Sequence, residues 1–180
     1  AIIGKVYNTL QLGLYNRAQT TSNYLSHNIS SLVNRVLFPV FCKEKDDDKL
    51  VEKFYTSIKL TSYLIFPLMI GLATVAEPFI QVVLTDKWID CVPYMQVLCI
   101  AYMWDPLMNF SVVLINSKGK SEYTFKAEII KKITAIAILA ATIPAGVMAM
   151  CCGLLIYSFA DIFIITRFTR IVLPEVNLKN

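Results

Sequence analysis

The sequence predicts an all-α membrane protein, a polytopic bundle of about five membrane-spanning helices. Hydrophobic residues make up 56% of the 180 positions, and the mean hydropathy is +0.57. Only 17% of residues are charged, and they cluster between the apolar runs. A soluble chain of this length distributes charge throughout to cover its surface, so these values exclude a soluble domain. The net charge of +4 then reflects membrane topology and gives no indication of nucleic-acid binding.

The first predicted helix covers residues 17–41. Its apolar positions recur at steps of three and four, as in Leu25, Ile29 and Val33, whereas the other side carries hydroxyl, amide and imidazole groups. In a bilayer such polar groups face the bundle interior or a water-filled cavity. We therefore expect this polar face to turn into the bundle. We expect residues 1–16 to end one element and turn into this helix, with Gly4 and Gly13 in the turn.

A charged stretch and a second helix follow. Residues 42–53, with the triplet Asp46–Asp48, are predicted to be a solvated loop without a metal. The second helix is predicted over 50–76, and its uncharged interior approaches the length of about 20 residues that crosses a bilayer. Residues 79–84 are too short to span and are expected to be a broken continuation of this helix or an interfacial piece. Trp88 follows at a position suited to the membrane interface.

Three further helices are predicted over 91–116, 122–143 and 147–168. The first of these is interrupted at Asp105-Pro106, and a tight Pro144–Gly146 turn makes the last two antiparallel. Membrane helices tolerate proline and glycine in their interiors. We therefore expect bending points at three positions of the bundle: Pro67, Gly71 and Pro106.

The basic residues predict the orientation of this five-helix chain. With five spans, the segments after the first, third and fifth helices share one side of the membrane. Almost all of the loop and flanking cations fall on that side: Lys43, Lys45, Lys49, Lys53, Lys118, Lys120, Lys126, Lys131, Lys132, Arg167 and Arg170. The positive-inside rule makes this side cytoplasmic, together with the C-terminus.

Polar residues of the first helix are the candidates for substrate binding. Arg17 and Arg35 lie about 27 Å apart at 1.5 Å per residue. Their guanidinium groups suit a diphosphate, because they bind phosphate oxygens in a forked geometry. The alternative is that both are anchors reaching the lipid headgroups. Four further side chains are suited either to sugar hydroxyls or to hydrogen bonds between helices: Tyr15, Asn16, Asn23 and Asn34.

Three titratable residues lie in apolar surroundings. His27, the single histidine, is suited to proton relay or to a satisfied polar position inside the bundle. Asp105 and Asp161 are candidates for ion coupling; the alternatives are a pair with another helix or a position near the interface. The five cysteines lack paired spacing and are interpreted as small buried apolar residues, so neither a metal nor a disulfide nor another cofactor is predicted. No enzyme motif is found.

Five segments carry a resemblance to a known family. In order along the chain they are LGLYNRA (12–18), NRVLFPVF (34–41), FPLMIGLATVAEPFIQVVLTDKW (66–88), VPYMQVLCIAYM (92–103) and NSKGKSEYTFKAEIIKK (116–132). The chain resembles the Wzx-type polysaccharide flippases of the multidrug/oligosaccharidyl-lipid/polysaccharide exporter superfamily. It is most similar to the lipopolysaccharide, capsule and exopolysaccharide exporters. The charged Asp105 departs from the family pattern, in which an uncharged residue precedes this proline.

The resemblance implies two similar helical lobes around a cationic central cavity, with residues 1–180 as most of the C-terminal lobe. It implies flipping of an undecaprenyl-diphosphate-linked oligosaccharide across the bacterial cytoplasmic (inner) membrane by alternating access. Implied partners are the lipid-linked cargo, membrane lipids, and the polysaccharide polymerase and chain-length machinery, without nucleic acid. Two alternatives are an ion-coupled small-molecule or drug exporter of the same superfamily and a membrane enzyme of glycan assembly that uses His27. We expect a transporter, not an enzyme.

Overall fold

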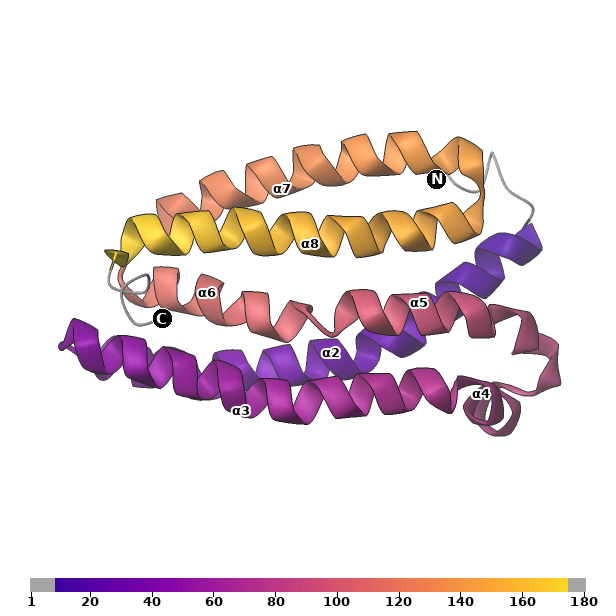
Figure 1. Cartoon of the computed structure of the whole chain (residues 1–180), viewed down its shortest axis with the longest axis horizontal. Coiled ribbons are helices and arrows are strands. Elements are labelled where there is room, and N and C mark those ends of the chain that lie inside the picture. Colours follow the sequence, from indigo (N-terminus) through magenta and orange to yellow (C-terminus); the bar gives the residue numbers. More distant parts are fainter. Residues whose placement is uncertain (1–8, 175–180) are drawn as a thin grey trace.

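Within residues 9–174, the protein is a bundle of five roughly parallel helical rods, one of them interrupted. In the computed structural model, residues 9–174 are described, and this part of the chain is helical without strands. The α7–α8 pair, the α5–α6 rod, and the α2–α3 pair follow one another across the bundle (Figure 1). This arrangement confirms the predicted all-α helical bundle. The rods are α2 (Thr9–Lys43), α3 (Asp47–Thr74), α5 (Val92–Tyr102) with α6 (Asp105–Ser117), α7 (Ser121–Thr142) and α8 (Val147–Val172).

Three segments of the described chain are long and apolar enough to cross a membrane: α3, the stretch Asp86–Ser117 and α8. The other two rods, α2 and α7, have the necessary length but a more polar composition. Both still present large apolar side chains outward: Leu32 and Val36 on α2 are each 59% exposed, and Ile133 on α7 is 63% exposed. This outward apolar surface supports the prediction that α2 and α7 are embedded beside the other three.

The rods alternate in direction as predicted. The α2–α3 turn, the α6–α7 turn and the end of α8 lie at one end of the bundle, and the α7–α8 turn lies at the other (Figure 1). Lys118, after α6, forms an ion pair with Asp47 at the start of α3, which ties two of these turns together. Most of the loop cations therefore gather at one end, with Lys87 of the link between α3 and α5 at the other. That this end is the cytoplasmic one stays a prediction.

The link between α3 and α5 is also helical. The short helix α4 (Ala76–Leu84) is turned across the end of the bundle, where Figure 1 shows it almost along its axis. The 3-10 helix η1 (Asp86–Cys91) leads into α5, after Thr85 takes a positive φ of 74°. The α7–α8 turn contains a second 3-10 helix, η2 (Ile143–Ala145), and Gly146 at φ 105°, as the predicted tight turn requires.

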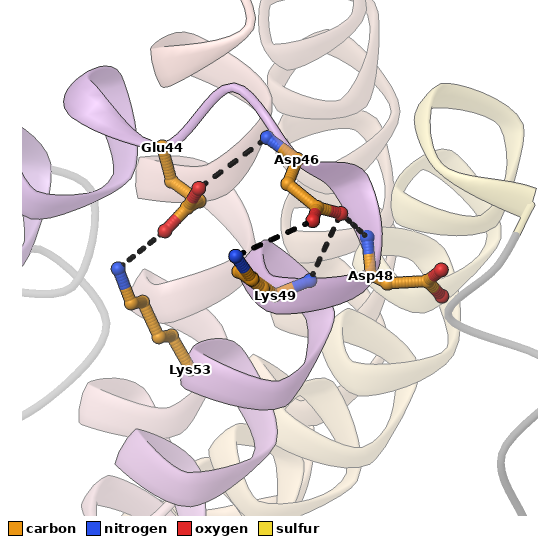
Figure 2. A network of polar contacts seen from close by, with 5 residues as sticks. All are labelled: Glu44, Asp46, Asp48, Lys49 and Lys53. Atoms are coloured by element: carbon orange, nitrogen blue, oxygen red, sulfur yellow. Dashed lines mark hydrogen bonds and ion pairs between the residues drawn. The ribbon is translucent and has the colours of Figure 1, made fainter.

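Two predicted turns are instead helical. Helix α2 begins at Thr9, so Gly13 lies inside it, against the Trp88 ring; Gly4 lies outside the described residues. The predicted loop 42–53 is reduced to residues 44–46, because Asp46 caps α3: its carboxylate accepts hydrogen bonds from the backbone N–H groups of Asp48 and Lys49 (Figure 2). The acidic triplet thus serves the helix start, where negative charge is favourable.

Candidate functional site

Only part of the predicted polar face of α2 turns into the bundle: His27, Asn34 and Arg35 of that face are exposed, and Val33 of the predicted apolar stripe is buried. Ser22 and Ser26 are fully buried against α5, whereas Leu32 and Val36 of the predicted apolar stripe face outward. Further along, the side-chain amide of Asn109 on α6 donates to the Ser30 carbonyl at 3.0 Å. Lipid solvates outward apolar groups, but hydroxyl and amide groups in a membrane need protein partners. Helix α2 therefore contributes hydrogen bonds in addition to the apolar contacts that Ala18, Val33 and Phe41 make in the core.

A cavity of about 440 Å³ opens between the α2–α6 pair and the α7–α8 pair, and we name it the polar cleft. Met108 and Val112 of α6 are its apolar lining residues. The rest of the lining is polar or charged: His27, Ser30, Ser31, Asn34, Asp105, Asn109, Glu128, Lys131, Tyr157 and Asp161. This concentration of hydrogen-bonding groups makes the polar cleft the candidate functional site.

Lys131 of α7 is the centre of the charges in the polar cleft. Its Nζ atom lies 2.9 Å from Oδ1 of Asp161 on α8 and 2.9 Å from Oε1 of Glu128 on its own helix. The side chains of Lys131 and Asp161 are only 9% and 11% exposed. The contact with Asp161 is an ion pair without hydrogen-bond geometry, and no other described group donates a hydrogen bond to that oxygen. This pair joins α7 to α8.

The charged residues of the polar cleft lie near the middle of the helices. Lys131, Asp161 and the start of α6 at Asp105 are each about 15–20 Å from the basic end, at 1.5 Å per residue. Half of a bilayer's hydrocarbon core is about 15 Å thick. Because three segments of this bundle are suited to crossing a membrane, these charges fall close to the membrane midplane. Ionisable groups at that depth are costly and typically functional.

Carboxylates outnumber cations in the polar cleft. Asp105, Glu128 and Asp161 face a single lysine, and within residues 9–174 no cation lies within ion-pairing distance of Asp105. Asp105 is the first residue of α6, where the positive end of the helix dipole favours its charge. The lining of the polar cleft therefore has more acidic than basic groups, whereas the family resemblance implied a cationic cavity.

Two predicted binding residues and both ion-coupling candidates meet in the polar cleft. His27 and Asn34 line it from α2, and Asp105 and Asp161 line it from α6 and α8. Asp161 forms an ion pair with Lys131 of α7, the kind of contact that one of its alternatives describes; ion coupling stays a prediction.

The other predicted binding residues lie outside the lining of the polar cleft. Arg17 is exposed, with its guanidinium carbon 5.1 Å from the centre of the Trp88 ring, and Arg35 is exposed nearer the basic end. Tyr15 is buried in the apolar core, Asn16 is exposed and Asn23 is half-buried. The structure thus does not bring the two arginines together.

Sequence reasoning missed Lys131 as a site residue, because it counted this lysine among the cytoplasmic flanking charges. The assignment as a flanking charge is wrong: Lys131 is buried about 15 Å from the start of α7. Two carboxylates neutralise it there, so it need not reach the headgroups. The three-residue spacing between Glu128 and Lys131 does predict an ion pair along one helix. No local signal pointed to the contact with Asp161, since only the packing of α7 on α8 creates it.

Comparisons with known proteins agree on one class. The family model described as "Polysaccharide biosynthesis protein" matches residues 1–93. An uncharacterized membrane protein in the cps region of Klebsiella pneumoniae is 32% identical over 157 residues, which are 86% of this chain and 32% of that protein.

Two further relatives have names that refer to particular polysaccharides. The teichuronic acid biosynthesis protein TuaB of Bacillus subtilis is 34% identical over 125 residues, 69% of this chain and 26% of its own length. The lipopolysaccharide biosynthesis protein WzxC of Escherichia coli is 28% identical over 131 residues, 72% of this chain and 27% of its own. The chain spans about a third or less of these relatives. No solved structure matches it.

Proposed function

Because the chain belongs to the polysaccharide biosynthesis protein family, we propose that it forms most of the C-terminal lobe of a two-lobed membrane transporter. This transporter flips an undecaprenyl-diphosphate-linked oligosaccharide, the repeat unit of a lipopolysaccharide, capsule or exopolysaccharide, from the inner to the outer leaflet. The names of TuaB and WzxC support a polysaccharide cargo. The bacterial cytoplasmic membrane is the proposed location, with the basic end and the C-terminus in the cytoplasm.

The observation that carries this proposal is the polar cleft, halfway along helices that include three apolar spans. An oligosaccharide cannot cross the hydrocarbon core unaided, because its hydroxyl groups would lose their hydrogen bonds to water. A row of amide, hydroxyl and carboxylate groups at the midplane replaces those bonds. Flipping then needs no bond chemistry, only two conformations that open to opposite sides and bind the cargo differently.

The proposed roles within the cargo path follow from the distribution of charge. His27, Asn34 and Tyr157 would bind sugar hydroxyls in the polar cleft. The excess of carboxylates there repels a diphosphate, so the diphosphate would instead meet Arg35 near the cytoplasmic end of α2 and Arg17 near its other end. The guanidinium groups at these two positions suit phosphate because each can donate two parallel hydrogen bonds to its oxygens.

We propose transport without catalysis or a cofactor. Among the described residues, no hydrogen bond or ion pair joins His27 to an acid or a nucleophile, so the chain shows no general-base pair for a glycan-assembling enzyme. Membrane lipids surround the bundle. The polysaccharide polymerase and chain-length machinery are the proposed protein partners that receive the flipped unit.

The second candidate function is an ion-coupled exporter of small molecules. The three carboxylates in the polar cleft favour it, because acidic groups at the midplane commonly bind protons or cations during transport.

The two functions are separated by reconstituting the complete transporter into vesicles. One set receives a fluorescent undecaprenyl-diphosphate oligosaccharide and the other a cationic dye, each with and without an imposed pH gradient. The flippase proposal expects transfer of the labelled oligosaccharide between leaflets and no extrusion of dye. Dye extrusion without oligosaccharide transfer would contradict the flippase proposal and support an ion-coupled exporter of small molecules. New glycosidic product formed in detergent would instead indicate an enzyme.

A further inference from the structure

The interruption between α5 and α6 leaves a backbone carbonyl without its helical donor. Helix α5 ends at Tyr102 and α6 begins at Asp105, with Pro106 as its second residue. In a continuous helix, the N–H of residue 106 would donate to the carbonyl of residue 102. Proline has no N–H, so the Tyr102 carbonyl needs another donor. This carbonyl lies inside the bundle, where an unsatisfied backbone group is costly.

Serine side chains from two other helices bind the carbonyls at this break. Ser26 of α2 donates its hydroxyl to the Tyr102 carbonyl at 2.8 Å. The hydroxyl of Ser158 on α8 is shared between the Ala101 carbonyl at 3.1 Å and the Leu154 carbonyl of its own helix at 3.0 Å. Ser26 is fully buried and Ser158 is 6% exposed, so water does not compete at either position. The interrupted rod is therefore held from both sides by hydroxyl groups that do not belong to it.

The residues after the break lead directly into the polar cleft. Asp105 is three residues beyond Tyr102 and immediately before Pro106, and it is the acid of the cleft that has no cation partner among residues 9–174. The direction in which α6 leaves the break therefore decides where this carboxylate lies. That direction depends on the two carbonyl groups at the end of α5.

We propose that Ser26 and Ser158 are positioning residues: by supplying the hydrogen bonds that the break removes, they fix the start of α6 and hold Asp105 in the polar cleft. The two serine contacts act on the backbone whether or not the protein transports a glycan, whereas a role for Asp105 as one of the polar groups beside the cargo rests on the proposed function. The residues act through the backbone of α5 and need not touch the cargo.

Ser22 provides a matched control on the same face of α2. It is one turn before Ser26 and equally buried, and its hydroxyl lies 3.3 Å from the carbonyl of Met95. Met95 lies inside α5, where the N–H four residues later supplies the ordinary helical bond. Loss of the Ser22 hydroxyl therefore leaves no carbonyl without a donor.

The test compares Ser26→Ala and Ser22→Ala, each alone and combined with Pro106→Ala, in the complete transporter. We expect Ser26→Ala to lower the unfolding midpoint by about 2–6 °C and to speed amide exchange at residues 103–108. Ser22→Ala should lower it by about 1 °C or less. In the Pro106→Ala background, the new N–H can donate to the Tyr102 carbonyl, so the extra effect of Ser26→Ala should disappear.

Equal effects of the two serine substitutions, or a Ser26→Ala effect that persists in the Pro106→Ala background, would overturn the proposal. If the Pro106→Ala variant does not fold, the test instead compares Ser26→Thr with Ser26→Val. These two side chains have the same shape, but only threonine keeps the hydroxyl group. Threonine should keep the exchange at 103–108 close to the native rate and valine should raise it; equal exchange in both would overturn the proposal. Since exchange and unfolding need no cargo, failure of the proposed function would leave these results unaffected.

Discussion

Two regions of this chain place lysines against carboxylates, and they differ chiefly in burial. At the turn between α2 and α3, Lys53 lies 2.5 Å from Glu44 and Lys49 lies 3.8 Å from Asp46 (Figure 2). The lysine side chains there are 46% and 68% exposed. In the polar cleft, Lys131 is 9% exposed and pairs with a carboxylate that is 11% exposed.

The difference shows that charge density along the sequence is a poor guide to the functional site. The turn is the most charged stretch of the chain, yet its residues cap α3 and meet solvent. Exposed ion pairs contribute little to stability, whereas removing one partner of a buried pair leaves an uncompensated charge. Of the two carboxylates that pair with Lys131, Glu128 lies on the same helix, whereas Asp161 lies on α8 and only packing brings it to the lysine.

The largest effect is expected for Lys131→Met. It leaves Glu128 and Asp161 without their cation at the midplane, which should cost about 3–5 kcal/mol of stability and abolish flipping. Lys132→Met is the matched control, since Lys132 is exposed on the same helix and should tolerate the change. Thermal unfolding and the vesicle flipping assay measure both. Similar losses in the two variants would mean that the buried Lys131 contributes no more than an exposed lysine of the same helix.

A smaller effect is expected for the two arginines of α2. If Arg17 and Arg35 meet the diphosphate, Arg17→Ala and Arg35→Ala should each lower the flipping rate about tenfold, the loss of one charge-assisted contact. Arg17→Ala should also destabilise the protein by about 0.5–1 kcal/mol, because it removes the contact with Trp88. Unchanged flipping in both variants would identify these arginines as membrane anchors.

Asp105→Asn separates the two candidate functions. Neutralising Asp161 would also disrupt its pair with Lys131, so Asp105, which has no cation partner in the described chain, gives the cleaner experiment. If the protein is a flippase, Asp105→Asn should change the rate of oligosaccharide transfer by less than about threefold. This corresponds to a change of under about 1 kcal/mol in the activation free energy. Loss of transfer together with loss of its response to a pH gradient would support ion coupling through Asp105.

The smallest effect is expected for Glu44→Gln at the turn. The hydrogen bond from Lys53, followed by the backbone N–H of Asp46, lowers the pKa of Glu44 below its usual value. A lowered folded-state pKa adds stability that is present above the ordinary carboxyl pKa and lost as the pH falls through the lower value. The small difference in unfolding midpoint between the native protein and Glu44→Gln should therefore shrink on acidification. A difference that grows towards low pH would contradict this assignment, and flipping should be unaffected throughout.

Much of the fold follows from hydropathy, because apolar runs separated by charge define the rods and their alternation. The helix ends around the first turns do not follow from it. Gly13 is accommodated within α2, and Asp46 turns a charged stretch into a helix start. For the site, His27, Asn34, Asp105 and Asp161 could be found from their polarity in apolar surroundings. The role of Lys131 could not, since a lysine near a predicted helix end looks like a flanking charge.

The most direct test of the central claim, that the polar cleft borders the path of the glycan, is photocrosslinking from two positions of α2. A photoreactive residue replaces Asn34, which lines the polar cleft, or Leu32, which is 59% exposed on the outward side. With a radiolabelled lipid-linked oligosaccharide, deglycosylation of the adduct distinguishes a sugar attachment from a lipid attachment. If the polar cleft borders the glycan path, sugar adducts form at position 34 and only lipid adducts form at position 32. Sugar adducts at 32 and none at 34 would contradict it.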